Sequence, residues 1–213
     1  MSSYSLTARV VWTPRGKVVG EKEVIRLVNR KVVLIRHGRS SHVVKGLLDL
    51  DAFLKWREAY EAAGIGENEV PPRELVLEAQ SAGAFVSSDV RRAIESARLL
   101  AAGRDVIASP LLRELSLVPL RLPGLRLPLM GWALTYGVKW LMRRHATPEE
   151  EQRVRIAAQW LIDLSARHGE VIVLTHASFR SLLAKEFARR EWKPVTPRRR
   201  SAHWSAWSFS PNQ

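Results

Sequence analysis

The sequence lacks cysteine altogether, so neither a disulfide nor a thiolate metal site can form. It also lacks an uninterrupted apolar run of the ~20 residues that a membrane-spanning helix needs. The most apolar stretch, residues 127–142, is broken by a proline, two glycines and a lysine. The N-terminus carries no apolar core of the kind found in secretory signals. We therefore expect a cytoplasmic protein without a transmembrane segment.

Acidic residues are few: 21 Asp and Glu stand against 34 Lys and Arg, which gives a net charge of +13. An excess of this size fits nucleic acid, an anionic membrane or a small anionic substrate as partner. The densest basic cluster, residues 188–200, is accompanied by no zinc-finger, helix-turn-helix or RNA-recognition motif. We predict that most of the charge is solvated surface and that there is no specific nucleic-acid partner. The oligomeric state stays open.

The chain divides into an irregular start and a regular remainder. Residues 1–30 show no clear period and contain Pro14, Gly16 and Gly20, so we predict an N-terminal extension with room for a short hairpin. From there on, β-branched apolar runs alternate with helical patterns. Residues 31–213 are therefore predicted to form a single domain.

Within this domain we predict strands at residues 31–36, 84–87, 105–109, 170–175 and 201–210, and helices at residues 48–64, 71–83, 90–102, 148–168 and 179–190. A capping box formed by Thr147 and Glu150 starts the fourth helix, and Ser178 is positioned to cap the last one. The alternation predicts an α/β fold, a three-layer α/β/α sandwich with a mostly parallel central sheet. In such folds the functional site lies at the carboxyl ends of the strands.

Reactive side chains follow four of the predicted strands; they are His37, His176, the pair Arg91 and Arg92, and Glu114. A neutral imidazole is a good nucleophile toward phosphorus when one ring nitrogen is free and the other is held. Guanidinium groups pair with phosphoryl oxygens, and a helix N-terminus adds a positive dipole end. A protonated histidine would donate a further hydrogen bond, and a carboxylic acid can protonate the leaving oxygen.

Each of these features alone has a simpler explanation. A histidine at a strand end is more often a structural hydrogen-bonding residue, the two arginines fit an exposed helix face, and Glu114 fits a solvated carboxylate. The order and spacing of the four segments together favour a catalytic site. His145, His168 and His203 form no metal-binding set with one another, so we predict no metal and no cofactor.

The four segments resemble those of the histidine phosphatase superfamily, also called phosphoglycerate-mutase-like, over residues 31–209. The similar segments are LIRHGRS (34–40) for the nucleophile, SSDVRRAIESA (87–97) for the pocket arginine, LREL (112–115) for the proton donor and VIVLTHASFRSLL (171–183) for the second pocket histidine. The resemblance implies that His37 is the nucleophile and Glu114 the proton donor. It implies Arg36, Arg92 and His176 as phosphate-binding residues.

The sequence departs from the usual pattern at several positions near these motifs. Arg39 stands where glutamate is frequent, Val43 where asparagine is common, and Ala177 where glycine is usual. Asp89 replaces the usual proline. None of these changes removes a reacting group, but they put the choice of substrate in doubt. Arg39 and His42 fit a position in the pocket and a position on the surface about equally well.

The resemblance implies a metal-independent phosphatase domain that hydrolyses the phosphate monoester of a small phosphorylated substrate through a phosphohistidine. Two alternatives stay open. One is a mutase that returns the phosphoryl group to a second hydroxyl, and the other is a non-catalytic module that binds a phospho-ligand or nucleic acid.

The Trp-rich segment 125–142 is either a buried helix or an apolar lid over the site. We favour the lid, because the segment after the acid often covers the pocket in this family.

Overall fold

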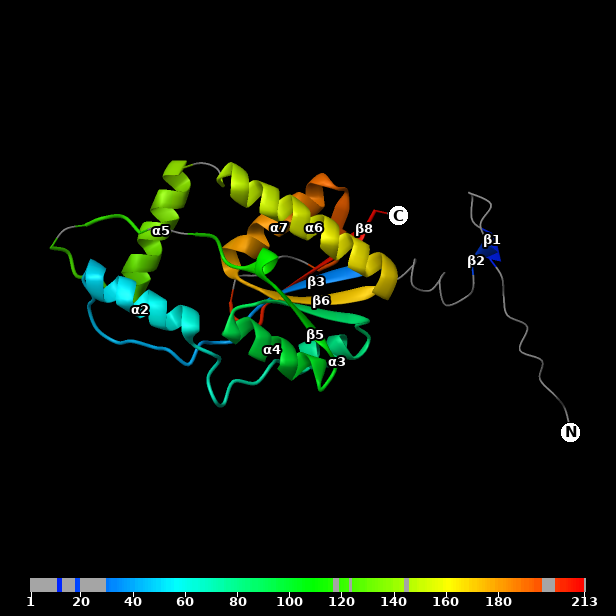
Figure 1. Cartoon of the computed structure of the whole chain (residues 1–213), viewed down its shortest axis with the longest axis horizontal. Coiled ribbons are helices and arrows are strands. Elements are labelled where there is room, and N and C mark those ends of the chain that lie inside the picture. The colour runs from blue at the N-terminus through cyan, green and yellow to red at the C-terminus, as the bar shows by residue number, and fades with distance from the viewer. Residues whose placement is uncertain are drawn as a thin grey trace, which may run out of the picture.

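The computed structural model describes residues 11–12, 18–19, 30–116, 119–122, 124–143, 146–196 and 202–212. The centre of the molecule is a six-stranded sheet in the order β5-β4-β6-β3-β8-β7 (Figure 1). The strands are β3 (Lys31–Arg36), β4 (Ala84–Ser88), β5 (Val106–Ser109), β6 (Glu170–Thr175), β7 (Trp192–Pro194) and β8 (Ala206–Pro211). The strands β5, β4, β6 and β3 run parallel to one another, and β8 and β7 add two antiparallel pairings at one side.

Helices cover both faces of this sheet. Helices α6 and α7 lie on one face and α3 and α4 on the other, while α2 and α5 lie together at one end of the molecule (Figure 1). The helices are α2 (Leu50–Ala62), α3 (Arg73–Gln80), α4 (Arg91–Ala101), α5 (Leu129–Arg143), α6 (Pro148–His168) and α7 (Ala177–Arg189), with a 3-10 turn at Pro110–Leu112. The predicted α/β sandwich with a mostly parallel sheet is therefore confirmed.

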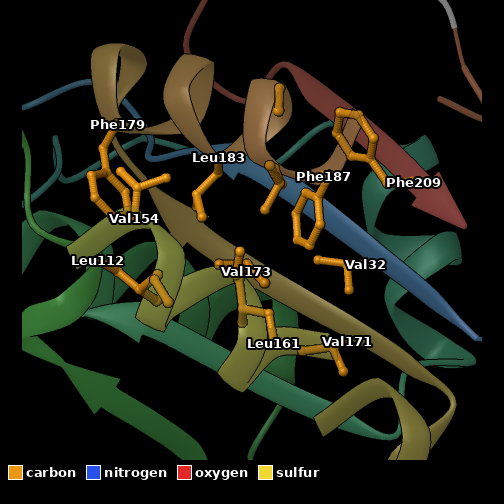
Figure 2. Close-up of a cluster of buried hydrophobic side chains, with 14 of the residues drawn as sticks. Val32, Leu112, Val154, Leu161, Val171, Val173, Phe179, Leu183, Phe187 and Phe209 are labelled. Carbon is orange, nitrogen blue, oxygen red and sulfur yellow. The ribbon is translucent and has the colours of Figure 1, made fainter. Parts of the chain in front are cut away.

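Strand β3 is buried on both faces, because its side chains alternate between two apolar cores. Val32 and Leu34 point into the core beneath α6 and α7, where Phe179 joins them (Figure 2). Val33 and Ile35 point into the second core, beneath α3 and α4. A strand buried in this way has a continuous apolar sequence, and its fixed position also fixes the residues that follow it.

Helix α6 begins and ends where local signals predict. Thr147 Oγ1 accepts the Glu150 N–H at 3.2 Å, and Glu150 Oε2 accepts the Thr147 N–H at 3.0 Å, which completes the predicted capping box. The helix ends before Gly169, whose φ of 77° lies in the left-handed region that glycine adopts without strain. Both boundaries are set by residues close in sequence.

Helix α7 begins differently from the prediction. The helix starts at Ala177, and His176 occupies the N-cap position without a side-chain capping bond. The amides of Ser178 and Phe179 donate instead to the Glu114 carboxylate, at 3.2 and 2.9 Å. The assignment of Ser178 as the cap was wrong, because the acceptor comes from a segment 64 residues earlier in the chain.

One further element, a short strand near the C-terminus, was not foreseen. The short strand β7 was not predicted, because three residues carry no recognisable period. In the predicted extension, β1 (Val11–Trp12) pairs antiparallel with β2 (Val18–Val19), and the other residues of 1–29 lie outside the described ones. The division into an extension and one catalytic domain stays a prediction. Within the described ranges, no helix is long and apolar enough to cross a membrane.

Candidate active site

Two histidines meet at the carboxyl edge of the sheet, because neighbouring parallel strands end side by side. Strands β3 and β6 pair in register with Arg36 opposite Thr175, so His37 and His176 follow at the same level. The backbone N–H of His37 donates to the Thr175 carbonyl at 3.1 Å. The imidazole ring centroids are 5.0 Å apart, and both side chains are buried. The sheet thus builds a pair of buried imidazoles.

The His37 ring is held in one tautomer. Its Nδ1 lies 2.7 Å from the Gly38 carbonyl oxygen, which can only accept, so Nδ1 carries the proton. Nε2 carries no proton, and its lone pair accepts a hydrogen bond from Arg92 Nε at 3.3 Å. Burial, His176 and Arg92 hold the pKa of His37 well below its usual 6.5. The ring is therefore neutral at neutral pH, with Nε2 in the form that can attack phosphorus.

The residue after His37 has no space for a side chain. A Cβ at Gly38 would lie 2.8 Å from a ring carbon of Trp204. Trp204 is itself fixed, since its Nε1 donates to Glu69 Oε1 at 2.8 Å. The Gly38 N–H donates to Ser96 Oγ at 2.9 Å. Close packing and this hydrogen bond therefore hold the carbonyl that orients His37.

The second histidine is also neutral. His176 Nδ1 lies 3.5 Å from Arg92 Nη2, which can only donate, so the proton sits on Nε2, 3.0 Å from Ser88 Oγ. Burial, followed by Arg92 and Arg36, lowers the pKa of His176 to about 3. The protonated His176 expected from the sequence is therefore not the form of this site, because guanidinium groups already surround the ring.

Arg92 and Arg91 are adjacent in sequence but have opposite environments. Arg92 is buried; its Nη1 donates to the Tyr60 carbonyl at 2.9 Å, its Cζ lies 4.3 Å from the Tyr60 ring centroid, and its Nη2 lies 3.4 Å from the Glu61 carboxylate. Arg91 is exposed and donates to Glu95 Oε1 at 2.7 Å. Consecutive helical residues point about 100° apart, so only Arg92 reaches the two histidines.

Arg36 is the last residue of β3 and is half-buried. Its backbone N–H donates to the Ser205 carbonyl at 3.1 Å, and its own carbonyl accepts the Trp204 N–H at 3.0 Å. Burial lowers the pKa of Arg36, while Tyr60 and Glu114 interact with its charge in the opposite direction. The guanidinium therefore belongs to the same electrostatic cluster as Arg92.

Glu114 lies at the N-terminus of α7 and accepts three backbone N–H groups. Leu115 and Phe179 donate to Oε1 at 3.0 and 2.9 Å, and Ser178 donates to Oε2 at 3.2 Å. Burial raises the pKa of Glu114 above its usual 4.5, and these donors oppose that change. The hydrogen bonds fix the position of the carboxyl group, and the raised pKa favours the protonated form that a general acid needs.

Arg39 and His42, the two possible pocket residues, lie beside this cluster. The Arg39 side chain is exposed, and its backbone N–H donates to Glu69 Oε1 at 2.9 Å. His42 stacks on Trp56 of α2, with 6.0 Å between the ring centroids. The structure thus places Arg39 at the surface and His42 against α2.

Three residues join the cluster that the sequence patterns did not reveal. Tyr60 and Glu61 of α2 both contact Arg92. His203 Nδ1 lies 3.0 Å from the His37 carbonyl oxygen, and the two rings are 5.4 Å apart. In the sequence, Tyr60 was only an apolar position of the predicted helix 48–64. His203 was only a histidine that forms no metal-binding set with the other histidines. Their place in the site depends on contacts between distant parts of the chain.

Four aromatic rings connect α5 to the site, and we call them the aromatic row: Trp132, Phe53, Trp56 and Tyr60. Trp132 of α5 stacks on Phe53 with 5.0 Å between centroids. Phe53 lies 5.7 Å from Trp56, which lies 5.0 Å from Tyr60. The spacing of three and four residues along α2 places the last three rings on one helix face. The row therefore supports the Tyr60 ring that lies against the Arg92 guanidinium.

A cavity of about 700 Å³ opens beside the buried cluster. Its described lining comes from α2, from the start of α4 and from residues 113–116, and includes Tyr60, Glu61 and Glu114. Two other lining residues, Arg113 and Asp89, form a bidentate ion pair with both N–O distances at 2.6 Å. A small organic ligand fits a volume of this size.

These groups together can bind and attack a phosphate ester. They combine two buried or half-buried guanidinium groups, a neutral imidazole with an unprotonated Nε2 and a carboxyl group with a raised pKa. In the part of the chain that the structure describes, no three Asp, Glu or His side chains lie close enough together to hold a metal ion. The positive charge of the cluster comes from arginine side chains.

The fold is that of the phosphoglycerate-mutase-like proteins of the histidine phosphatase superfamily. The ecdysone phosphate phosphatase of Bombyx mori, solved with tungstate, is 13% identical over 86% of this chain and 92% of its own, with a TM-score of 0.51. The phosphoglycerate mutase of Bacillus anthracis is 15% identical over 85% of this chain and 91% of its own, with a TM-score of 0.52. No model of a known family and no curated protein sequence matches the chain. At such identities the likeness establishes the fold.

Proposed function

We propose that this chain is a phosphatase of the histidine phosphatase superfamily, which hydrolyses a phosphate monoester without a metal ion through a phosphohistidine at His37. The observation that carries the proposal is the state of His37. The imidazole is buried and neutral, its Nδ1 proton is bound by the Gly38 carbonyl, and its Nε2 lone pair lies beside Arg92. The fold shared with a phosphatase and a mutase supports the same conclusion.

In the first step, Nε2 of His37 attacks phosphorus, so that an N–P bond forms and the ester P–O bond breaks. Arg36 and Arg92 offset the charge on the phosphoryl oxygens. A bound phosphate dianion favours the protonated form of His176, which then donates a hydrogen bond to it. The protonated carboxyl group of Glu114 gives its proton to the leaving oxygen, and the alcohol departs.

In the second step, water attacks the phosphohistidine. The Glu114 carboxylate takes a proton from the water, the new P–O bond forms, and the N–P bond to His37 breaks. Inorganic phosphate leaves, with His37 neutral and Glu114 protonated as at the start. The cavity that Glu114 lines together with Glu61, Asp89 and Arg113 offers space for the attacking water beside this carboxyl group.

The test is to trap the intermediate on the purified protein. The chain is incubated with an aryl phosphate and with a panel of sugar, nucleotide and lipid-headgroup phosphates, quenched in base, and mapped by mass spectrometry. We expect release of inorganic phosphate, unaffected by a chelator, and an acid-labile phosphoryl group on His37. His37→Ala should abolish both, and the exposed His168→Ala should retain both. A phosphoryl group on another residue, or an isomerised product without phosphate release, would contradict the proposal.

A further inference from the structure

Helix α5 exposes an apolar stripe to solvent. Met130, Leu134 and Val138 recur every four residues and are 80%, 68% and 40% exposed. At this spacing they lie on one side of the helix. Trp132 is buried on the opposite side, where it packs on Phe53 of α2, and Thr135 is buried beside it. The stripe is therefore a free face of a helix that is already anchored through its other face.

More exposed apolar side chains lie near the start of α5. Leu48 and Leu127 exchange two backbone hydrogen bonds of 2.8 and 2.9 Å, which join the segment before α2 to the segment before α5. Leu47, next to Leu48, and Leu125, two residues before Leu127, are exposed. Large apolar side chains thus gather on one end of the molecule, where Figure 1 shows α5 and α2 together.

The same two segments are strongly basic. Residues 115–148 contain no Asp or Glu, and their cationic side chains are Arg121, Arg126, Lys139, Arg143 and Arg144. Residues 39–48 also contain no Asp or Glu but carry Arg39 and Lys45. Among the described residues, four of these cations are exposed: Arg39, Lys45, Arg121 and Arg126. The first carboxylate after residue 48 is that of Asp49, which caps α2 by accepting the Ala52 N–H.

Apolar side chains on a basic background fit one kind of occupant best. A second copy of the chain would bring the same cations against each other, because a two-fold contact pairs a surface with itself. An anionic lipid bilayer takes up the apolar side chains and attracts the surrounding Lys and Arg side chains. With 15 residues, α5 is too short to span a bilayer but can lie in its surface.

We propose that α5 and the segments 39–48, 119–122 and 124–128 form a docking surface for anionic lipid membranes, on which α5 lies flat with Met130, Leu134 and Val138 inserted between the lipids. This surface is separate from the buried cluster around His37. Membrane binding therefore does not depend on phosphatase chemistry, and His37→Ala should bind vesicles as the wild-type chain does.

The experiment is co-sedimentation of the full chain with vesicles of phosphatidylcholine alone, or with about one third phosphatidylglycerol. We expect binding to the anionic vesicles and loss of binding as salt rises from about 0.1 M to about 1 M. The double variant Met130→Ser/Leu134→Ser should weaken binding by about tenfold or more, because it removes the inserted apolar area. Arg121→Gln/Arg126→Gln should weaken binding and reduce its salt dependence.

The matched control changes apolar residues of similar exposure elsewhere. Leu77 on α3 and Ile156 on α6 are 53% and 48% exposed, and Leu77→Ser/Ile156→Ser should leave vesicle binding unchanged. Circular dichroism checks that each variant is folded. Equal binding by the α5 variant and the control variant would overturn the proposal. Absence of binding to the anionic vesicles would also overturn the proposal. A dimer in sedimentation velocity that the α5 variant dissociates would then identify a second copy of the chain as the occupant.

Discussion

Adjacent residues of this chain differ sharply in environment, and Arg91 and Arg92 provide a direct test of the site. Arg92 contacts both buried histidines, whereas Arg91 pairs with Glu95 in solvent. Arg92→Ala should lower kcat/KM by about 10²–10³-fold, because a charged donor to the phosphoryl group is lost. Arg91→Ala should change it by less than about threefold. Steady-state kinetics on one substrate compares the two variants, and equal losses would refute the proposed phosphate site.

Glu114 caps the start of α7 and is our proposed proton donor, two roles that different substrates can separate. Glu114→Gln should slow alkyl phosphates by about 10²–10⁴-fold, because the alkoxide leaving group needs a proton. Nitrophenyl phosphate should be slowed far less, since nitrophenolate departs without protonation. The amide oxygen of glutamine, in the place of Oε1, can still accept the N–H groups of Leu115 and Phe179, so the start of α7 should survive the loss of the longer bond from Ser178. An equal loss on both substrates would mean that Glu114 acts only in positioning α7.

At the scale of elements, the aromatic row makes the position of α2 depend on α5. Phe53 is buried between Trp132 and Trp56, so Phe53→Ala should leave a cavity between the two helices. Large-to-small changes of this kind cost about 3–5 kcal/mol. Urea unfolding should show a loss of this size, whereas the exposed Leu99→Ala should cost less than about 1 kcal/mol. A loss for Phe53→Ala no larger than that control would show that α2 and α5 are not held by these rings.

The ends of a helix or strand could be predicted from the sequence when the residues that fix them lie nearby in the chain. They could not be predicted when those residues are distant in sequence. Strands β3 and β6 were predicted with their observed ends, because each is one apolar run between polar or glycine residues. The boundaries of α6 follow from Thr147 and Gly169 in the same way. The cap of α7 could not be predicted, since its acceptor, Glu114, is remote in sequence.

The residues of the candidate site differ in the same way, since some follow local patterns and others join the site only through long-range contacts. His37 and His176 could be placed at one edge from the sequence, because parallel strands align their carboxyl ends. The contribution of His203 could not, since 166 residues separate it from His37 and no local pattern marks it. The neutral state of His176 also needed the structure, because burial and neighbouring arginines determine it.

At the scale of the whole molecule, buried neutral histidines make stability depend on pH. The pKa values of His37 and His176 are lowered in the folded chain, whereas an unfolded histidine takes up a proton near pH 6.5. The unfolded state therefore gains protons as pH falls through 6.5, and folding stability decreases. Each of the two histidines contributes about 1.4 kcal/mol per pH unit below 6.5. The raised pKa of Glu114 acts in the opposite direction and offsets part of this loss.

Urea unfolding between pH 7.5 and pH 5 measures this dependence, in a range above the ordinary pKa of carboxylates. The free energy of unfolding should fall steadily as the pH drops below 6.5. His176→Gln removes one of these groups, so the slope of this fall should decrease by about 1.4 kcal/mol per pH unit. A wild-type stability that does not change between pH 6.5 and pH 5 would mean that these imidazoles are protonated in the folded chain.

The order of the strands has a consequence for biosynthesis. Strand β3 leads directly into His37 and is flanked by β6 and β8, and Ala206 of β8 follows Lys31 by about 175 residues. At about 5–20 residues per second, the ribosome completes β8 roughly 10–35 s after β3. Both hydrogen-bonding edges of β3 lack their final neighbours until β6 is made, and one edge lacks its neighbour until β8 is made, which exposes an apolar strand to pairing with other chains. Nascent chains that stall before β8 should therefore depend on chaperones to stay out of aggregates.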